Sequence, residues 1–514
     1  MLASIKSASV LGIEAYDITV EVDAAQGLPQ WFIVGLPAGA VKESRERVGA
    51  ALVNAGFKLP PRRITINLAP ADVRKEGTGF DLPIAVGILI ATGQLPADAA
   101  QHRLFAGEVG LDGTVRGIRG ALPIAIRAAS HEGTTLVLPP SNVAEARLVA
   151  ALPLCAPATL SELFSWLRRS SLPPPAPSPS GIQPSDYLDF ADVVGQESAK
   201  RAMEVAAAGA HNVLMIGPPG AGKTMLARRL PGILPALTEA EALEATAIHS
   251  VAGALTAGHA LVSAAPFRAP HHSVSNAGLI GGGNPPRPGE VSLAHNGILF
   301  LDELLEFPRH VIESLRQPME DGRVVISRAA CTVTFPARFT LVGAMNPCPC
   351  GNATEPSRVC ICSAADVSKY RARLSGPLAD RIDMNVHVGA VSLRALSSST
   401  ASEASTSIRT RVERARWLQR VRYKPLSGVT CNAHVSGRWL DTHGGIESGA
   451  RELLASAAER LALTARGYHR VIKVARTVAD LDNSEAIAVA HAAEALRYRP
   501  AVITSGPRLL AMQR

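Results

Sequence analysis

The sequence predicts an α/β protein in which a parallel sheet with helices on both faces follows a mixed α and β domain and precedes a helical region. Three features support this prediction. A glycine-rich loop lies between an apolar strand and a helical pattern, an apolar run near residue 300 ends in two acidic residues, and a proline-rich segment divides the chain. A chain of 514 residues is also too long for one hydrophobic core, so several domains are expected.

The composition is typical of a globular protein and excludes a disordered chain, because 47% of the residues are hydrophobic and 19% are charged. No apolar run reaches the roughly 20 residues that span a bilayer, and the N-terminus has no apolar segment of signal-peptide length. We therefore expect a cytoplasmic protein without a membrane partner. The net charge of +8 suits DNA or RNA, although a basic enzyme can equally bind neither.

The predicted domains are residues 1–169, 187–391 and 392–514, with residues 170–186 as a linker. Repeated prolines among serine and alanine predict that this linker is extended and solvated. In the first domain, hydrophobic patterning predicts a strand at 63–68, a hairpin within 104–118, and helices at 41–55 and 121–130.

The glycine-rich loop has the full G-x-x-x-x-G-K-T pattern of a P-loop. Its residues are Gly217, Pro218, Pro219, Gly220, Ala221, Gly222, Lys223 and Thr224. Glycines let backbone N–H groups close around phosphates at a helix N-terminus. Lys223 would reach the β- and γ-phosphates and the Thr224 hydroxyl would coordinate Mg²⁺, so the pattern predicts ATP and Mg²⁺ as cofactors.

The apolar run at 298–301 is typical of a buried parallel strand that ends in Asp302 and Glu303. Asp302 would hold Mg²⁺ and Glu303 would polarise the attacking water. A second apolar strand ends at Asn346, which either orients that water or is an ordinary turn residue.

Two later arginines are candidates for positive charge at the γ-phosphate beyond Lys223. Arg381 and Arg476 each follow an apolar pattern, and either could equally be a surface residue. An arginine finger can come from a neighbouring subunit. If Arg381 acts in this way, the active enzyme must be a ring or a filament.

Four cysteines lie close together as two C-x-C pairs: Cys348, Cys350, Cys360 and Cys362. Four thiolates can close a tetrahedral zinc site. Two disulfides or four free thiols are the alternatives. The adjacent His271 and His272 lack further spaced ligands and are interpreted as structural.

Longer stretches give these motifs a family context. The chain resembles the magnesium-chelatase-like AAA+ ATPases of the ComM/YifB family over nearly its whole length, through residues 34–37, 41–47, 67–72, 267–272, 288–297, 374–381, 468–470 and 475–481. The resemblance implies a P-loop AAA+ αβα core with a C-terminal helical lid, assembled as a homo-hexameric ring. Arg381 looks like the finger that acts on the neighbouring subunit, and Arg476 looks like the second sensor.

Proteins of this family are associated with natural transformation, so the resemblance implies a DNA helicase that drives branch migration during homologous recombination. It also places two insertions in the pore, at 266–288 and 321–334. Their basic residues are the candidate DNA contacts: Arg268, Arg287, Arg323 and Arg328. An ordinary surface hairpin is the alternative for the second insertion.

The first domain resembles the proteolytic domain of the Lon family without its Ser-Lys dyad. Gly79 lies where the nucleophile should be, and residues 117–123 contain no lysine that could act as the general base. We interpret it as a DNA-binding or assembly collar. Its basic residues could bind phosphate or simply be solvated: Arg45, Arg47, Arg62, Arg63, Arg74 and Lys75.

A basic, aromatic-containing helix is predicted at 409–424, either as a DNA contact or as a lid helix that packs on another subunit. The sequence thus predicts an ATP-driven DNA motor. A metal-chelatase motor and a protein-remodelling ATPase without nucleic acid are the alternatives.

Overall fold

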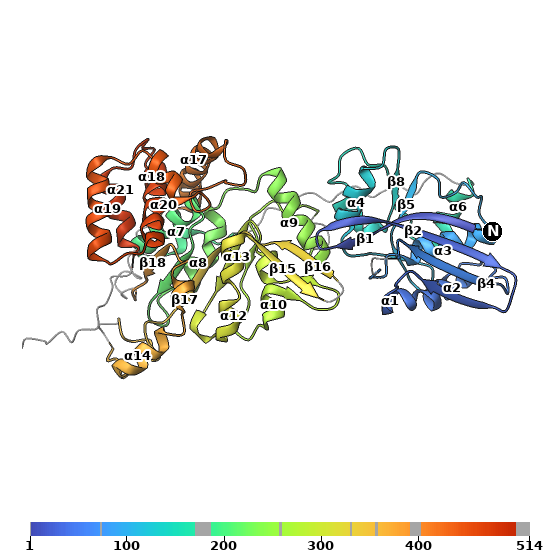
Figure 1. Cartoon of the computed structure of the whole chain (residues 1–514), viewed down its shortest axis with the longest axis horizontal. Helices are drawn as coiled ribbons and strands as arrows, with labels where there is room; N and C mark the ends of the chain where they lie inside the picture. The colour runs from blue at the N-terminus through green and yellow to red at the C-terminus, as the bar shows by residue number, and fades with distance from the viewer. Residues whose placement is uncertain are drawn as a thin grey trace, which may run out of the picture.

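The computed structural model describes residues 2–71, 75–169, 187–255, 260–328, 331–354, 358–390 and 402–499. These residues form an N-terminal unit, a central unit and a helical C-terminal unit, which follow one another along the long axis of the molecule (Figure 1). The α/β class is confirmed. The predicted linker at 170–186 and the predicted boundary at 391–392 lie outside the described residues.

The N-terminal unit is built on a seven-stranded mixed sheet of order β3-β4-β2-β1-β5-β8-β9. The strands are β1 (Leu2–Leu11), β2 (Glu14–Ala25), β3 (Gln30–Val34), β4 (Arg63–Ala69), β5 (Arg103–Phe105), β8 (Thr135–Val137) and β9 (Leu154–Cys155). Buried and less buried residues alternate along β2 and β4, as expected for strands with one face on the core. The predicted strand at 63–68 is confirmed, and the predicted hairpin is present as β6 (Glu108–Val109) and β7 (Val115–Arg116).

Helices cover this sheet, and their bounds are α1 (Gly39–Lys42), α2 (Ser44–Asn54), α3 (Asp81–Ala91), α4 (Ala121–Ala129), α5 (Val143–Ala146), α6 (Leu160–Leu167) and the 3₁₀ turn η1 (Pro140–Asn142). Every residue of α3 is buried, because α3 packs on β1 and β2 and is covered by α2. The helices predicted at 41–55 and 121–130 are confirmed, the first with a break at Glu43.

The central unit contains a five-stranded parallel sheet of order β11-β14-β17-β10-β18. Its strands are β10 (Val213–Ile216), β11 (Phe267–Arg268), β14 (Gly297–Leu301), β17 (Phe339–Met345) and β18 (Met384–His387). The larger helices of this unit are α7 (Glu197–Gly209), α8 (Lys223–Ile233) and α9 (Glu239–Ala252), with the 3₁₀ turn η2 (Phe190–Asp192) before them. All strands run in one direction, so their carboxyl ends meet at one edge of the sheet.

Short elements connect the sheet to its insertions: α10 (Asn276–Ile280), β12 (Gly281–Gly282), β13 (Arg287–Pro288), α11 (Glu290–Leu293), η3 (Leu304–Glu306), α12 (Arg309–Glu313), α13 (Arg316–Asp321), β15 (Arg323–Arg328), β16 (Cys331–Pro336), α14 (Ala364–Arg371) and α15 (Gly376–Ala379). The N-terminal unit contacts the central unit. Its Gly12 turn lies against Val333 of β16, and Glu145 accepts a hydrogen bond from Ser250 of α9.

The C-terminal unit is formed by α17 (Ser405–Tyr423), α18 (Gly437–His443), α19 (Ser448–Arg460), α20 (Ala465–Leu481) and α21 (Val489–Arg497). One apolar cluster runs from the central sheet through α7 into α17 and α20, so the lid and the sheet share a core. Among the described helices, none combines the length and apolar character needed to cross a bilayer.

Candidate nucleotide site

The P-loop leaves the carboxyl end of β10 and enters α8. Gly220 and Gly222 adopt φ values of +80° and +91°, which a residue with a Cβ rarely tolerates, and α8 begins at Lys223. The Lys223 ammonium donates to the carbonyls of Gly217 and Pro218 at 2.7 and 2.9 Å. Burial lowers the pKa of Lys223, while the charges of the nearby acids oppose that shift.

The two predicted magnesium ligands lie together. The Thr224 hydroxyl donates to a carboxylate oxygen of Asp302, which follows β14, at 2.6 Å. Oxygens this close fit within one Mg²⁺ coordination sphere. Asn346, at the end of β17, lies across the loop with its amide oxygen 3.3 Å from Lys223 Nζ. Lys223, Thr224, Asp302 and Asn346 thus come together at one edge of the sheet.

Glu303 follows Asp302 in a left-handed backbone conformation with φ of +50°, and 58% of its side chain is exposed. A positive φ at a residue other than glycine is uncommon and occurs often at functional sites. His272 Nδ1 lies 3.7 Å from the Glu303 carboxylate, and the His272 ring lies against the His271 ring, with centroids 4.0 Å apart and planes tilted by 35°. The histidine pair therefore lies beside the glutamate proposed to polarise the attacking water. This contact could not be predicted, because only the fold brings residues 272 and 303 together.

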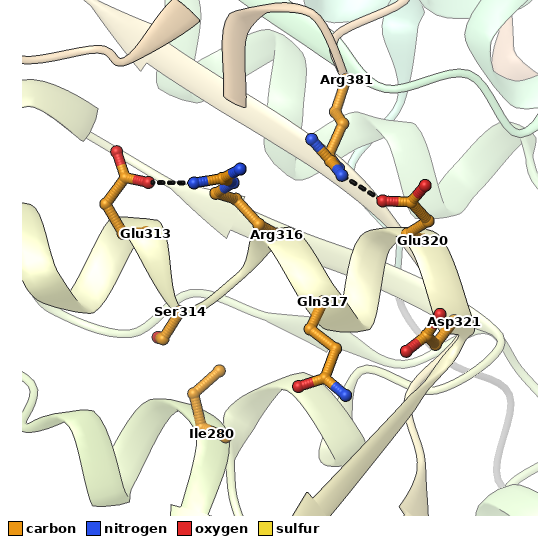
Figure 2. A pocket seen from close by; sticks show the side chains of 8 residues that line it. All are labelled: Ile280, Glu313, Ser314, Arg316, Gln317, Glu320, Asp321 and Arg381. Atoms are coloured by element: carbon orange, nitrogen blue, oxygen red, sulfur yellow. Dashed lines mark hydrogen bonds and ion pairs between the residues drawn. The ribbon is translucent and has the colours of Figure 1, made fainter. Parts of the chain in front are cut away.

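Arg381 lies at the opposite edge of the sheet. It precedes β18, which runs parallel to β10 with Met384 paired to Val213, so Arg381 is at the amino ends of the strands and the P-loop is at their carboxyl ends. The Arg381 guanidinium forms an ion pair with Glu320 of α13 (Figure 2). It also donates to the Pro377 carbonyl at 2.8 Å. Four-residue strands separate the two edges by roughly 13 Å, so Arg381 cannot serve the P-loop of its own chain.

Two further arginines lie near this ion pair. Arg381 lowers the pKa of the Glu320 carboxyl, and the charges of Arg466 and Arg470 lower it further. Arg470 also pairs with Asp383 at 2.8 Å, which joins α20 of the lid to the amino edge of the sheet. Neither arginine was predicted as a site residue, although Arg470 lies within the 468–470 motif and Arg466 lies two residues before it.

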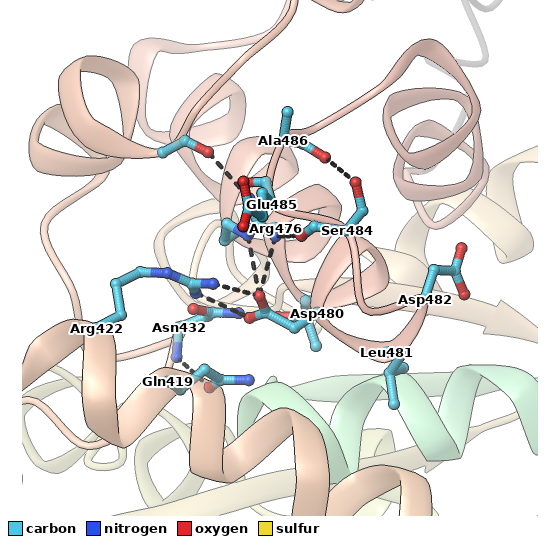
Figure 3. Close-up of polar contacts among 12 residues, drawn as sticks. Gln419, Arg422, Asn432, Arg476, Asp480, Leu481, Asp482, Ser484, Glu485 and Ala486 are labelled. Carbon is cyan, nitrogen blue, oxygen red and sulfur yellow. Dashed lines mark hydrogen bonds and ion pairs between the residues drawn. The ribbon is translucent and has the colours of Figure 1, made fainter.

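The placement of Arg476 corrects its assignment as the second sensor. Its side chain is only 1% exposed and lies inside the lid (Figure 3). The guanidinium pairs with Asp480 and donates to the carbonyls of Gly444, Ser484 and Glu485. With its donors used in this way, Arg476 stabilises the helical unit and is not presented to a nucleotide.

Comparison with known proteins agrees with this geometry. Profiles described as "Magnesium chelatase, subunit ChlI", "Subunit ChlI of Mg-chelatase" and "Magnesium chelatase, subunit ChlI C-terminal" match residues 189–396, 20–142 and 402–499. "Competence protein ComM" of Haemophilus influenzae is 42% identical over 507 residues, which cover 98% of each chain. "Uncharacterized protein YifB" of Escherichia coli is 40% identical over 500 residues, 97% of each chain. The chain belongs to the ComM/YifB family of magnesium-chelatase-like AAA+ ATPases.

A more distant relative shares only part of the chain. The "Magnesium-chelatase 38 kDa subunit" of Rhodobacter capsulatus is 30% identical over 190 residues, which cover 33% of this chain and 53% of that protein. This ComM/YifB-family chain is therefore an ATPase of the magnesium-chelatase-like class, for which ATP and Mg²⁺ are the implied cofactors.

The predicted DNA contacts divide into two groups. Arg287, Arg323 and Arg328 are exposed on the β12–β13 and β15–β16 hairpins. The hairpins touch, since a Cβ on Gly281 would lie 2.9 Å from Ile326. Arg268 differs from these three arginines and is no longer counted among the candidate DNA contacts. It lies in β11 of the central sheet, where Glu290 binds its guanidinium through two hydrogen bonds of 2.6 and 2.8 Å.

The basic helix α17 packs on its own chain. Arg409 and Arg416 donate to the carbonyls of Gly232 and Ala207, and Arg422 pairs with Asp480. These three contacts attach α17 to the central unit and to α20, so the helix stabilises the contact between lid and core.

Several basic residues of the N-terminal unit also contact other residues of the same chain. Arg47 pairs with buried Asp81, and Arg45 pairs with Glu46. Arg63 lies over the Phe32 ring, and Lys75 is buried. Arg62 is exposed, and Arg74 lies outside the described residues.

Proposed function

We propose that the chain is an ATP-driven, homo-hexameric DNA motor that acts as a branch-migration helicase in homologous recombination and natural transformation. The observation that carries the proposal is the position of the P-loop and Arg381 at opposite edges of one parallel sheet. A subunit with its phosphate site on one edge and the Arg381 guanidinium on the other would complete its active site only against a neighbour. A closed ring satisfies every such site.

The carboxyl edge supplies the chemistry of hydrolysis. Lys223 would contact the β- and γ-phosphates, while Thr224 and Asp302 would hold Mg²⁺, which neutralises phosphate charge when bound. Glu303 would polarise the attacking water, and Asn346 would orient it. The proposed cofactors are thus ATP and Mg²⁺, with a structural zinc ion at the four cysteines as a third.

The amino edge would supply the finger. Within the chain Arg381 pairs with Glu320, so on assembly the γ-phosphate of the neighbouring subunit would compete with that carboxylate for the guanidinium. Arg466 and Arg470 make the same edge more positive. This arrangement would couple hydrolysis to contact between subunits.

The DNA part of the proposal rests on the two adjacent hairpins and on the net charge of +8. Exposed Arg287, Arg323 and Arg328 can bind phosphates without reading base sequence, as a translocating motor requires. A relative named for competence supports a role in transformation.

Two alternatives remain distinct from this proposal. A chelatase motor would need partner subunits and a porphyrin, and the chelatase relative matches only a third of the chain. A protein-remodelling ATPase would hydrolyse ATP without regard to DNA.

The test is the ATPase rate with no DNA and with single-stranded, forked or four-way junction DNA, using Lys223→Ala as the blank. We expect stimulation that is strongest with branched DNA and absent from the blank. A Lys223-dependent rate that no DNA changes would refute the motor and favour a protein or chelatase partner.

A double variant tests the DNA surface separately. Arg287→Ala/Arg328→Ala should weaken DNA binding several-fold and reduce its salt dependence, while the ATPase rate without DNA stays unchanged. Arg451→Ala, an exposed arginine paired with Asp441 in the lid, is the matched control.

A further inference from the structure

The loop that follows Asn346 gathers four cysteines around a common centre. The sulfur atoms of Cys348, Cys350, Cys360 and Cys362 lie within 4.8 Å of one another. Cys348 is 3.4 Å from Cys350 and 3.7 Å from Cys360, and Cys350 is 3.6 Å from Cys360, measured between sulfurs. A disulfide requires about 2.05 Å. The cluster is therefore a set of free thiols.

These separations fit a tetrahedral zinc site. Zn–S bonds of about 2.3 Å place the sulfurs of such a site about 3.8 Å apart. The backbone N–H of Cys350 points at Cys362 Sγ, at 3.4 Å, and such a contact stabilises a thiolate ligand. Thiolates select soft or borderline ions such as zinc over Mg²⁺ or Ca²⁺, and four of them leave no open coordination position. The chemistry is that of a structural ion.

The same loop touches both sides of the nucleotide site. On one side, only Pro347 separates Cys348 from Asn346, whose amide contacts Lys223. Pro347 is itself held by Arg371, which donates to its carbonyl at 3.3 Å.

On the other side, Gly351 packs on the P-loop. A Cβ on Gly351 would lie 2.5 Å from Cδ of Pro219, closer than real Cβ contacts allow. The cysteine loop thus lies between Asn346 and the wall of the phosphate site.

We propose that the four cysteines bind one zinc ion, and that the zinc-bound loop braces the nucleotide site by holding Asn346 against Lys223 and Gly351 against Pro219. The ion would hold together the part of the loop around Cys360, where apolar packing is weak, because Val359 and Ile361 are each 85% exposed. The inference rests on the proposed function only in that ATP is the nucleotide.

The metal is tested on the full chain, purified without added metal. We expect about one zinc per chain in the wild type and none in Cys350→Ser/Cys362→Ser, whose affinity for ATP should fall by about tenfold or more. Cys155→Ala, which removes a buried thiol of the N-terminal unit, should keep both zinc and ATP affinity. Absence of zinc from the wild type, or its retention in the double serine variant, would overturn the metal assignment.

A second variant tests the brace without touching the ligands. Gly351→Ala should retain zinc and lose ATP affinity, because the new methyl group collides with Pro219. Gly133→Ala is the matched control, since Gly133 has a similar φ of +69° against +80° but nothing within 4 Å of its Cβ position. Unchanged ATP affinity in Gly351→Ala would refute the brace.

Cobalt provides an independent readout. Cobalt bound in place of zinc should show the intense visible absorption of a tetrahedral thiolate site, and its absence would count against the geometry. None of these measurements needs DNA or hydrolysis. A chain that binds zinc and ATP but does not respond to DNA would refute the proposed motor and leave this inference intact.

Discussion

At the carboxyl edge of the central sheet, functional side chains follow their strands directly, whereas at the amino edge they gather from loops and from the lid. Asp302 and Asn346 each come immediately after a strand, as the P-loop does. Arg381 instead precedes its strand and takes its partner, Glu320, from a helix 61 residues earlier. The residues of the carboxyl edge can therefore be recognised from sequence motifs, whereas those of the amino edge come together only when the chain folds.

The two edges would also contribute different groups to the proposed ATP hydrolysis. The carboxyl edge holds the residues proposed to bind phosphate, metal and water, and Lys223 is the cation proposed to contact the γ-phosphate there. The amino edge is rich in guanidinium groups and has no P-loop. Each edge has what the other lacks, which is the pattern expected of a site shared between subunits.

Loss of the finger should have the largest effect. Arg381→Ala is expected to reduce ATP turnover by about 10³-fold or more while ATP binding survives. Mixing Arg381→Ala with Lys223→Ala should restore part of the activity, because mixed rings contain interfaces with one intact copy of each edge. Turnover that stays absent after mixing would argue that Arg381 does not act across an interface.

At the carboxyl edge, Glu303→Gln should reduce hydrolysis by about 10²- to 10⁴-fold and leave ATP and Mg²⁺ binding intact, because only the carboxylate that polarises water is lost. Single-turnover hydrolysis and equilibrium ATP binding measure the two effects. Weaker ATP binding of comparable size would instead mean that Glu303 holds the nucleotide.

The scaffold of the amino edge should respond in stability. Burial alone would raise the pKa of Asp383, but contact with His211 and the charge of Arg470 outweigh it, so its pKa is lowered. A carboxyl group whose pKa is lowered by folding stabilises the folded state at pH values above its unfolded-state pKa of about 4. That stabilisation is lost as the pH falls towards the folded-state pKa. Asp383→Asn should therefore cost about 3 kcal/mol at neutral pH. Thermal melts should show that the difference in melting temperature between Asp383→Asn and wild type becomes smaller below about pH 4.

Arg476 lies in neither edge, and its substitution should show this. Arg476→Ala is expected to destabilise the lid by about 2–3 kcal/mol, with Arg422 still neutralising Asp480. Turnover per folded chain should stay within about twofold of wild type. A full loss of turnover at unchanged melting temperature would restore the sensor assignment.

The sequence predicted some regions of the molecule better than others. The α/β class, the strands that carry the P-loop and Asp302, and the N-terminal helices could be predicted, because short-range periodicity and fixed spacing determine them. His272, Arg466 and Arg470 were missed, since no local pattern places them near Glu303 or Glu320.

By itself, the sequence determined the order of the domains and the chemistry at the ends of parallel strands, because any residue that follows such a strand must reach the same edge. Tertiary structure alone decided where each arginine lies and what it binds. Arg268, Arg381 and Arg476 look alike along the chain, yet Glu290 binds the first beside the sheet, Glu320 binds the second where it lines a pocket at the amino edge, and Asp480 and three carbonyls enclose the third. A guanidinium has the same charge everywhere, so its role depends on the acceptors that distant segments bring to it.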